Sequence, residues 1–139
     1  MKLRLFIDGA SRGNPGPAGI GVVVQDARGR TIAEVREFLG EATNNVAEYQ
    51  ALLRALSEAE ARGADDLEIY ADSDLLVRQI QGTYRVRRAH LVPLHARALR
   101  ALQGFRRWQI AHIPREKNAG ADALANRALD ESEGSVRPR

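Results

Sequence analysis

The 139-residue sequence predicts a single α/β domain in which helices flank a mixed five-stranded sheet. Three strand-like runs follow one another closely in the first 38 residues, which is typical of an antiparallel meander. Two later strand-like runs are separated by helical patterns, and such connections make parallel neighbours with right-handed crossovers. If the first strand is central, the fourth can lie beside it in parallel, and the strand order is 3-2-1-4-5.

The first strand is expected at residues 3–8, LRLFID, which alternate in the strand period and end at the carboxylate of Asp8. A glycine-rich loop follows this strand. Residues 19–26 and 31–38 are the next two strands, separated by the turn-forming sequence DARGR.

The rest of the chain alternates helices and strands. Residues 43–63 switch to helical spacing and end at Gly63. A strand, a short helix, a longer helix, the fifth strand and a last helix follow at residues 67–72, 73–82, 91–104, 107–113 and 118–129. We assign residues 1–130 to one domain and expect residues 131–139 to form a disordered tail.

The composition excludes several protein classes. There is no cysteine, so disulfides and thiolate metal sites are ruled out. No apolar run approaches the roughly 18 residues of a membrane span, and the N-terminus lacks the apolar core of a signal peptide. We therefore expect a cytoplasmic monomer that does not bind membranes.

The net charge of +3 is small, but it is unevenly distributed. No acidic residue occurs between Asp74 and Glu116, whereas this span contains nine arginines and three histidines. A segregated arginine-rich segment favours a polyanionic partner, since guanidinium groups suit phosphate. The alternative is a solvated arginine-rich surface without a partner.

Four carboxylates are candidates for one site. Asp8 and Asp72 end the first and fourth strands, and parallel neighbours lie about 4.8 Å apart, so their side chains would meet at the carboxyl ends of these strands. Glu48 and Asp122 lie in the first turns of the long helix and the last helix. Four such acids could hold two Mg²⁺ or Mn²⁺ ions about 4 Å apart, the arrangement for in-line displacement at a phosphodiester.

Each of these acids alone also has a local explanation. Glu48 could close a capping box with Asn45, and Asp72 or Ser73 could cap the short helix. Asp122 could offset the dipole of its helix, and Asp8 could begin an Asx turn. It is the convergence of the four acids that favours a metal site.

Four sequence blocks, DGASRGNPGPAGIG, TNNVAEYQALLRAL, ADSDLLVRQI and AHIPREKNAGADALAN, resemble in order those of ribonuclease HI. The resemblance covers roughly residues 3–129 and is strongest to the compact bacterial and archaeal branch of the type 1 enzymes. It implies a ribonuclease H-like fold in residues 1–130. It also implies an endonuclease that hydrolyses the RNA strand of RNA/DNA hybrids, leaving 5′-phosphate and 3′-hydroxyl ends.

The resemblance also implies roles for individual residues. The metal-binding quartet falls on Asp8, Glu48, Asp72 and Asp122, which would hold two Mg²⁺ or Mn²⁺ ions when substrate is bound. The loop histidine of the family falls on His112, which would assist proton movement or product release. A lone histidine is otherwise more often a structural hydrogen bonder.

Substrate contacts are implied for a further set of residues. Asn14, Asn44 and Asn45, with backbone groups near Gly9, match positions that touch RNA, and Thr43 matches a residue that grips a DNA phosphate. Small amides and backbone groups can also recognise a 2′-hydroxyl. The alternative is that residues 43–45 only cap the helix.

The chain departs from the family pattern in two places. Asp74 stands where relatives often have glutamine, which places a negative charge near the expected RNA path. The segment between Gln81 and Leu91 is too short for the basic protrusion of longer bacterial enzymes, and Arg85, Arg87 and Arg88 are expected to replace it in part.

Two aromatic residues are further candidates for contact with the substrate. Tyr84 and Trp108 could face the DNA strand, although a lone tryptophan in a strand usually belongs to the core.

Three alternative functions are a non-catalytic nucleic-acid-binding domain, a DNA-directed polynucleotidyl transferase and an aspartyl-phosphate phosphatase. The phosphatase is the weakest, because Ala10 stands where it would have a second aspartate.

Overall fold

The computed structural model describes the backbone of residues 1–136 and the side chains of residues 1–133. Five strands and four α-helices run along the chain in the order β1 (Lys2–Ser11), β2 (Gly16–Asp26), β3 (Thr31–Ala42), α1 (Asn44–Ala61), β4 (Asp66–Ala71), α2 (Asp74–Gln81), α3 (Val92–Leu102), β5 (Arg107–His112) and α4 (Ala119–Val136). Two short 3₁₀ turns, η1 (Ala89–Leu91) and η2 (Arg115–Lys117), precede α3 and α4.

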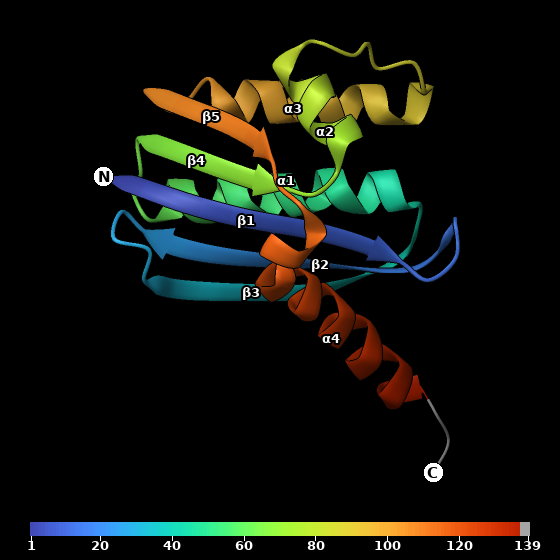
Figure 1. Cartoon of the computed structure of the whole chain (residues 1–139). Helices are drawn as coiled ribbons and strands as arrows, with labels where there is room; N and C mark the ends of the chain where they lie inside the picture. Colours follow the sequence, from blue (N-terminus) through green and yellow to red (C-terminus); the bar gives the residue numbers. More distant parts are fainter. Residues whose placement is uncertain (137–139) are drawn as a thin grey trace.

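The sheet has the predicted order β3-β2-β1-β4-β5 (Figure 1). β1 pairs antiparallel with β2 and parallel with β4. β2 pairs antiparallel with β3, and β4 pairs parallel with β5. The prediction of an antiparallel meander followed by parallel strands is therefore confirmed.

Helices cover the two faces of the sheet. α1 packs on β1 and β2 on one face, where α2 contacts β4 and β5 and α3 packs against α1, and α4 crosses β1, β2 and β3 on the other face (Figure 1). The larger core lies under α1, where Leu3, Leu5 and Ile7 of β1 meet Leu52 and Leu56 of the helix. Each such fully buried side chain stabilises the fold by about 2 kcal/mol.

Two glycines allow the helices to approach the sheet backbone directly. A Cβ atom at Gly9 of β1 would lie 2.3 Å from the backbone carbon of Ala47 in α1. A Cβ atom at Gly21 of β2 would lie 2.1 Å from the backbone oxygen of Ala121 in α4. Since any side chain at these positions would clash, glycine sets how closely each helix packs.

β1 and β2 are longer than predicted. Strand pairing continues from Asp8 to Ser11, opposite Ala18, so most of the expected glycine-rich loop is a β-hairpin. The Arg12 N–H donates to the Pro17 carbonyl (2.8 Å) and helps to close the turn. Asp8 therefore lies inside a strand rather than at its end, which corrects the prediction from the sequence.

α4 is also longer than predicted. We expected a disordered tail over residues 131–139, whereas the helix continues to Val136. Arg36 pairs with Glu131 (2.5 Å) and Arg12 pairs with Glu133 (2.8 Å), which ties these turns to β3 and to the hairpin. The end of the predicted tail, residues 137–139, lies outside the described residues.

None of the helices in residues 1–136 combines the length and the apolar composition that a membrane span requires.

Candidate active site

The candidate site lies at an opening in the middle of the sheet. β1 and β4 pair in parallel as far as Ile7 and Ala71. β4 then ends, whereas β1 continues to Ser11, so Asp8 has no neighbouring strand on its β4 side. Asp72 follows Ala71 directly, and the side chains of both acids lie at this opening.

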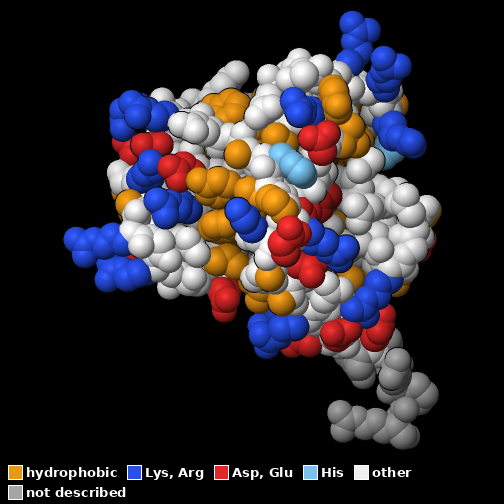
Figure 2. Space-filling view, in the orientation of Figure 1, with side chains coloured by type: hydrophobic (Ala, Val, Ile, Leu, Met, Phe, Trp, Pro, Cys, Tyr) orange, Lys and Arg blue, Asp and Glu red, His pale blue; other side chains and the backbone are white. Residues whose placement is uncertain are grey.

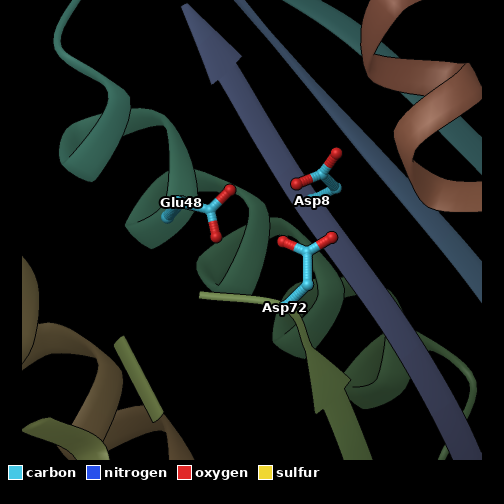
Figure 3. Close-up of side chains that lie close together, drawn as sticks. All are labelled: Asp8, Glu48 and Asp72. Atoms are coloured by element: carbon cyan, nitrogen blue, oxygen red, sulfur yellow. The ribbon is translucent and has the colours of Figure 1, made fainter. Parts of the chain in front are cut away.

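Three carboxylates converge there. Asp8, Glu48 and Asp72 each present an oxygen, and these oxygens all lie within 4.8 Å of one another. Figure 3 shows the carboxylates of β1, of α1 and of the segment after β4 pointing toward one another. Asp8 and Glu48 are buried, and Asp72 is partly exposed. The structure thus brings together three of the four acids predicted from the sequence.

Glu48 reaches the site because α1 contacts the strand at Gly9. The Gly9 N–H donates to Glu48 Oε1 (2.6 Å), while Oε2 is buried without a hydrogen-bond partner among the described residues. Glu48 is the fifth residue of α1 and lies beyond its first turn, which corrects the predicted position. Its carboxylate does not cap the helix, so the capping-box explanation is wrong.

Burial and mutual repulsion raise the pKa of both buried acids. Burial is the largest cause of the raised pKa of Asp8, and the negative charges of Glu48 and Asp72 add to it. Burial also raises the pKa of Glu48, although the Gly9 N–H opposes this shift by stabilising the carboxylate. A divalent cation would offset the repulsion between the carboxylates, because it favours the ionised form of every neighbouring acid.

Asp122 lies at the edge of the carboxylate cluster. It is in the first turn of α4, as predicted, and is near enough to Asp8 to act as a hydrogen-bonding neighbour that raises the pKa of Asp8. Its carboxylate also accepts a hydrogen bond from Arg115 (3.5 Å). The fourth predicted acid is therefore adjacent to the cluster but outside the group of three.

His112 lies beside the site on the next strand. It ends β5 in register with Ala71, one residue before Asp72, and its side chain is exposed. An exposed imidazole at this place is accessible to a ligand bound over the carboxylates.

The starts of α1 and α2 are capped by hydroxyl groups. Thr43 Oγ1 accepts a hydrogen bond from the Val46 N–H, and Ser73 Oγ accepts one from the Leu76 N–H, both at 3.2 Å. The cap of α2 is therefore Ser73, which leaves Asp72 for the carboxylate cluster. Thr43 therefore has the structural role of a helix cap, and the residue is also partly exposed.

The residues expected to touch RNA surround the hairpin turn and the start of α1. Asn14 Oδ1 accepts a hydrogen bond from the Asn44 N–H (3.0 Å), which ties the exposed turn to the helix. Gly9 lies at the base of the same hairpin with its N–H on Glu48. Asn14, Asn44 and Thr43 therefore form one polar surface next to the carboxylates.

A second predicted set lines a groove of about 820 Å³ between α1, α2 and the segment before α3. Asn45 lies on the α1 side, and Arg85, Arg87 and Arg88 lie on the other side. Figure 2 shows basic side chains projecting at the upper right, over the segment between α2 and α3. Among the described residues, none of these three arginines has an ionic partner, so their charge is available to an anion.

The two candidate aromatic residues have different environments. Tyr84 is exposed and lines the groove, whereas Trp108 packs against the hydrophobic core. Trp108 thus contributes to the packing of the core while remaining partly exposed, and its contact with a DNA strand stays a prediction.

Sequence reasoning missed two buried polar residues. Gln79 is 4% exposed and lines the groove, and its Oε1 accepts a hydrogen bond from the Tyr49 hydroxyl (2.6 Å). Asn118 is 1% exposed and contacts Asp72. The sequence offered one sign for each residue. Gln79 is a polar residue at a position that the helical pattern makes internal, and Asn118 is a polar residue at the start of the last predicted helix.

Asp74, the departure from the family pattern, has a partner within its own helix. Its carboxylate pairs with Arg78 (3.2 Å), four residues later, and both side chains are about half exposed. The negative charge of Asp74 is therefore partly balanced on the surface of α2.

Comparison with known proteins identifies similar chains. The model of the reverse transcriptase-like family matches residues 6–128. Ribonuclease HI of Halobacterium salinarum is 45% identical over 94% of this chain, and the bifunctional protein Rv2228c of Mycobacterium tuberculosis is 44% identical over the same share. The chain spans 66% of the length of the first relative and 36% of the second.

Solved structures agree with this similarity. The crystal structure of RNase H1 from H. salinarum superimposes with a TM-score of 0.92, covering 94% of this chain and 99% of that one. LC11-RNase H1, solved in complex with an RNA/DNA hybrid, is 44% identical, with a TM-score of 0.89 and coverage of 94% and 98%.

Proposed function

The chain belongs to the ribonuclease H family, and from this we propose that it is an endonuclease that hydrolyses the RNA strand of RNA/DNA hybrids. The products would carry 5′-phosphate and 3′-hydroxyl ends. A location in the cytoplasm and a monomeric state remain predictions.

One observation carries this proposal above all others. Three carboxylates from separate elements meet within 4.8 Å, although their charges repel and burial raises the pKa of two of them. No lysine or arginine neutralises this group of three among the described ion pairs. Such an arrangement costs stability, and a divalent-cation site accounts for it.

The donor set fits Mg²⁺ or Mn²⁺. Carboxylate oxygens are the ligands that these hard cations prefer, and the unpartnered Oε2 of Glu48 is a buried acceptor in the cluster. Asp8, Glu48 and Asp72 would hold the ions, with Asp122 at the edge, and we propose two ions when substrate is bound. Bound divalent ions supply an activated water and stabilise the departing oxygen at a phosphodiester.

The remaining chemistry falls to side chains around the cluster. Gly9 holds Glu48 in place through its N–H, so the carboxylate does not have to reorganise during the reaction. His112 is exposed beside Asp72 and would carry a proton to the departing oxygen or assist release of the product.

The two polar surfaces would bind the two strands of the hybrid. Asn14 and Asn44 lie at the hairpin turn and the start of α1, and the Gly9 N–H lies on Glu48, so amide and N–H groups there can recognise the 2′-hydroxyls of RNA. Thr43 would contact a DNA phosphate at the start of α1. Arg85, Arg87 and Arg88 rim the groove and would contact phosphates farther along the duplex, where Tyr84 offers an exposed ring.

The substrate preference separates this function from the alternatives. Labelled RNA/DNA, RNA/RNA and DNA/DNA duplexes are incubated with Mg²⁺, Mn²⁺ or a chelator, and the products are resolved by length and end group. We expect cleavage of the RNA strand of the hybrid alone, at internal positions, and no cleavage in chelator.

Other outcomes would contradict the proposal. Cleavage of the all-DNA duplex would favour a DNA-directed polynucleotidyl transferase. Tight binding of the hybrid without cleavage under any metal condition would favour a non-catalytic binding domain.

A further inference from the structure

Asn118 connects the parts of the protein that carry the carboxylates. It lies between η2 and α4, and its carbonyl accepts a hydrogen bond from the Asp122 N–H (3.1 Å), so it begins the helix that presents Asp122. Its own N–H donates to the Arg115 carbonyl (2.9 Å), which closes the preceding turn. The backbone of Asn118 thus fixes where α4 starts.

The side chain of Asn118 extends into the opening of the sheet. Its Nδ2 donates to the Ile7 carbonyl (2.9 Å) and to Asp72 Oδ2 (3.3 Å). Ile7 precedes Asp8 and is the last residue of β1 that pairs with β4. One amide group therefore bridges the strand of Asp8 and the side chain of Asp72 at the point where β4 ends.

The orientation of this amide is determined by its partners. Both neighbours of Nδ2 are acceptors. If the amide oxygen and nitrogen were exchanged, Oδ1 would face these two acceptors and no hydrogen bond could form. In the orientation that the structure has, Oδ1 is buried without a partner among the described residues.

We propose that Asn118 is a positioning residue of the carboxylate cluster, which orients Asp72 through Nδ2 and sets Asp122 through the start of α4. The inference rests on the proposed metal-dependent function of the same site. Groups that hydrogen-bond to metal ligands restrict their rotation, and their loss typically lowers metal affinity or activity by about 10- to 100-fold.

The test compares Asn118→Ala and Asn118→Asp with a matched control, Asn126→Ala. Asn118→Asp keeps the volume of the side chain and creates no cavity, but it replaces the donating amide with a carboxylate oxygen that repels Asp72, whereas Asn118→Ala removes the contact without adding charge. Asn126 lies on α4 and donates to the Asp122 carbonyl (2.9 Å), and among the described residues no hydrogen bond joins it to Asp72. All variants are first checked for cooperative unfolding in urea.

Two measurements then report on positioning. Calorimetric titration of Mn²⁺ into the protein without nucleic acid gives the dissociation constant of the metal. The Mg²⁺ concentration for half-maximal cleavage is measured at saturating hybrid. We expect both constants to rise about 10- to 100-fold in the Asn118 variants and less than about threefold in Asn126→Ala.

The outcomes separate this inference from the proposed function. Asn118 variants that bind Mn²⁺ and respond to Mg²⁺ like the wild type, even if less stable, would overturn the positioning role alone. A wild-type protein that neither binds Mn²⁺ nor cleaves the hybrid would overturn the proposed function, and the inference with it.

Discussion

The carboxylate cluster and the arginine-lined groove differ in how the fold holds their side chains. Asp8 and Glu48 are buried, and each extends from a regular element that packs directly on backbone. Arg85, Arg87 and Arg88 are exposed and lie in the irregular segment between α2 and η1. Chemistry at a single phosphodiester requires fixed geometry, whereas contacts along a polymer tolerate side chains that adapt.

The two regions also differ in charge compensation. Among the described residues no cation pairs with the three converging acids, and the ion pair of Arg115 is with Asp122, at the edge of the cluster. The groove has the opposite imbalance, since its three arginines lack acidic partners among the described residues. The cluster therefore offers a place for an external cation, and the groove offers one for an external anion.

The largest expected effect is the loss of catalysis on removing one buried carboxylate. Asp8→Asn keeps the shape of the side chain but removes a proposed metal ligand, so cleavage of an RNA/DNA hybrid should fall by at least about 1,000-fold. Hybrid affinity, measured by fluorescence anisotropy, should stay within about threefold of the wild type or improve.

Asp130→Asn is the matched control, because Asp130 pairs with Arg12 on the surface of α4. It should retain most of the activity. Cleavage that persists in Asp8→Asn would show that Asp8 is not part of the mechanism. It would also contradict the proposal that the cluster carries the chemistry while the groove only binds substrate.

The next effect concerns the pH dependence of metal-free stability. Because the folded-state pKa values of Asp8 and Glu48 are raised, the folded protein binds protons above about pH 5 that the unfolded chain has released. The free energy of unfolding in chelator should therefore decrease as the pH rises from 5 to 8, by about 1 to 3 kcal/mol from this cluster. Urea unfolding at several pH values measures it.

Asp8→Asn again provides the comparison, since it removes one of these protons and the repulsion. Carboxyl groups with lowered pKa, such as Glu58 and Glu68, are ionised in both states above about pH 5 and do not contribute. An equally steep decrease in wild type and variant would show that the cluster is not the source of the pH dependence.

The smallest effect is expected in the groove. Changing Arg85, Arg87 and Arg88 together to alanine should weaken hybrid binding about tenfold at 0.1 M salt and reduce the slope of log affinity against log salt by up to about 3. The maximal cleavage rate at saturating hybrid should change little, because the cluster is untouched. Anisotropy titrations from 50 to 200 mM salt measure both quantities.

Arg97 and Arg100, on the outer side of α3 beside α1, offer a control pair for the same titrations. Their change to alanine should leave the salt slope nearly unaltered. If the triple variant also keeps the wild-type slope, the groove does not contact the substrate.

Much of the fold followed from periodicity. Strand alternation and the spacing of helices predicted an antiparallel meander followed by parallel strands, and taking the first strand as central placed Asp8 next to Asp72. The ends of elements were predicted less well. β1 extends past Asp8 because the hairpin pairs with Ala18, and α4 extends because distant arginines pair with its last turns. Such long-range contacts leave no local pattern.

The candidate site was predictable in its acids and not in its supports. Carboxylates after strands and at helix starts stand out in a sequence, so all four could be named. Asn118 and Gln79 could not, because an asparagine before a helix or a glutamine within one is usually a cap or a surface residue. Only burial and named partners distinguish them.

Gly9 and Gly21 have a consequence for how much the sequence around the site can vary. Each helix that borders the carboxylates rests on the main chain of a strand, on opposite sides of the same sheet. The distances from the strands to α1 and α4, which carry Glu48 and Asp122, are thus set by contact between backbones at these two glycines. The spacing of the carboxylates therefore depends on these two positions remaining glycine.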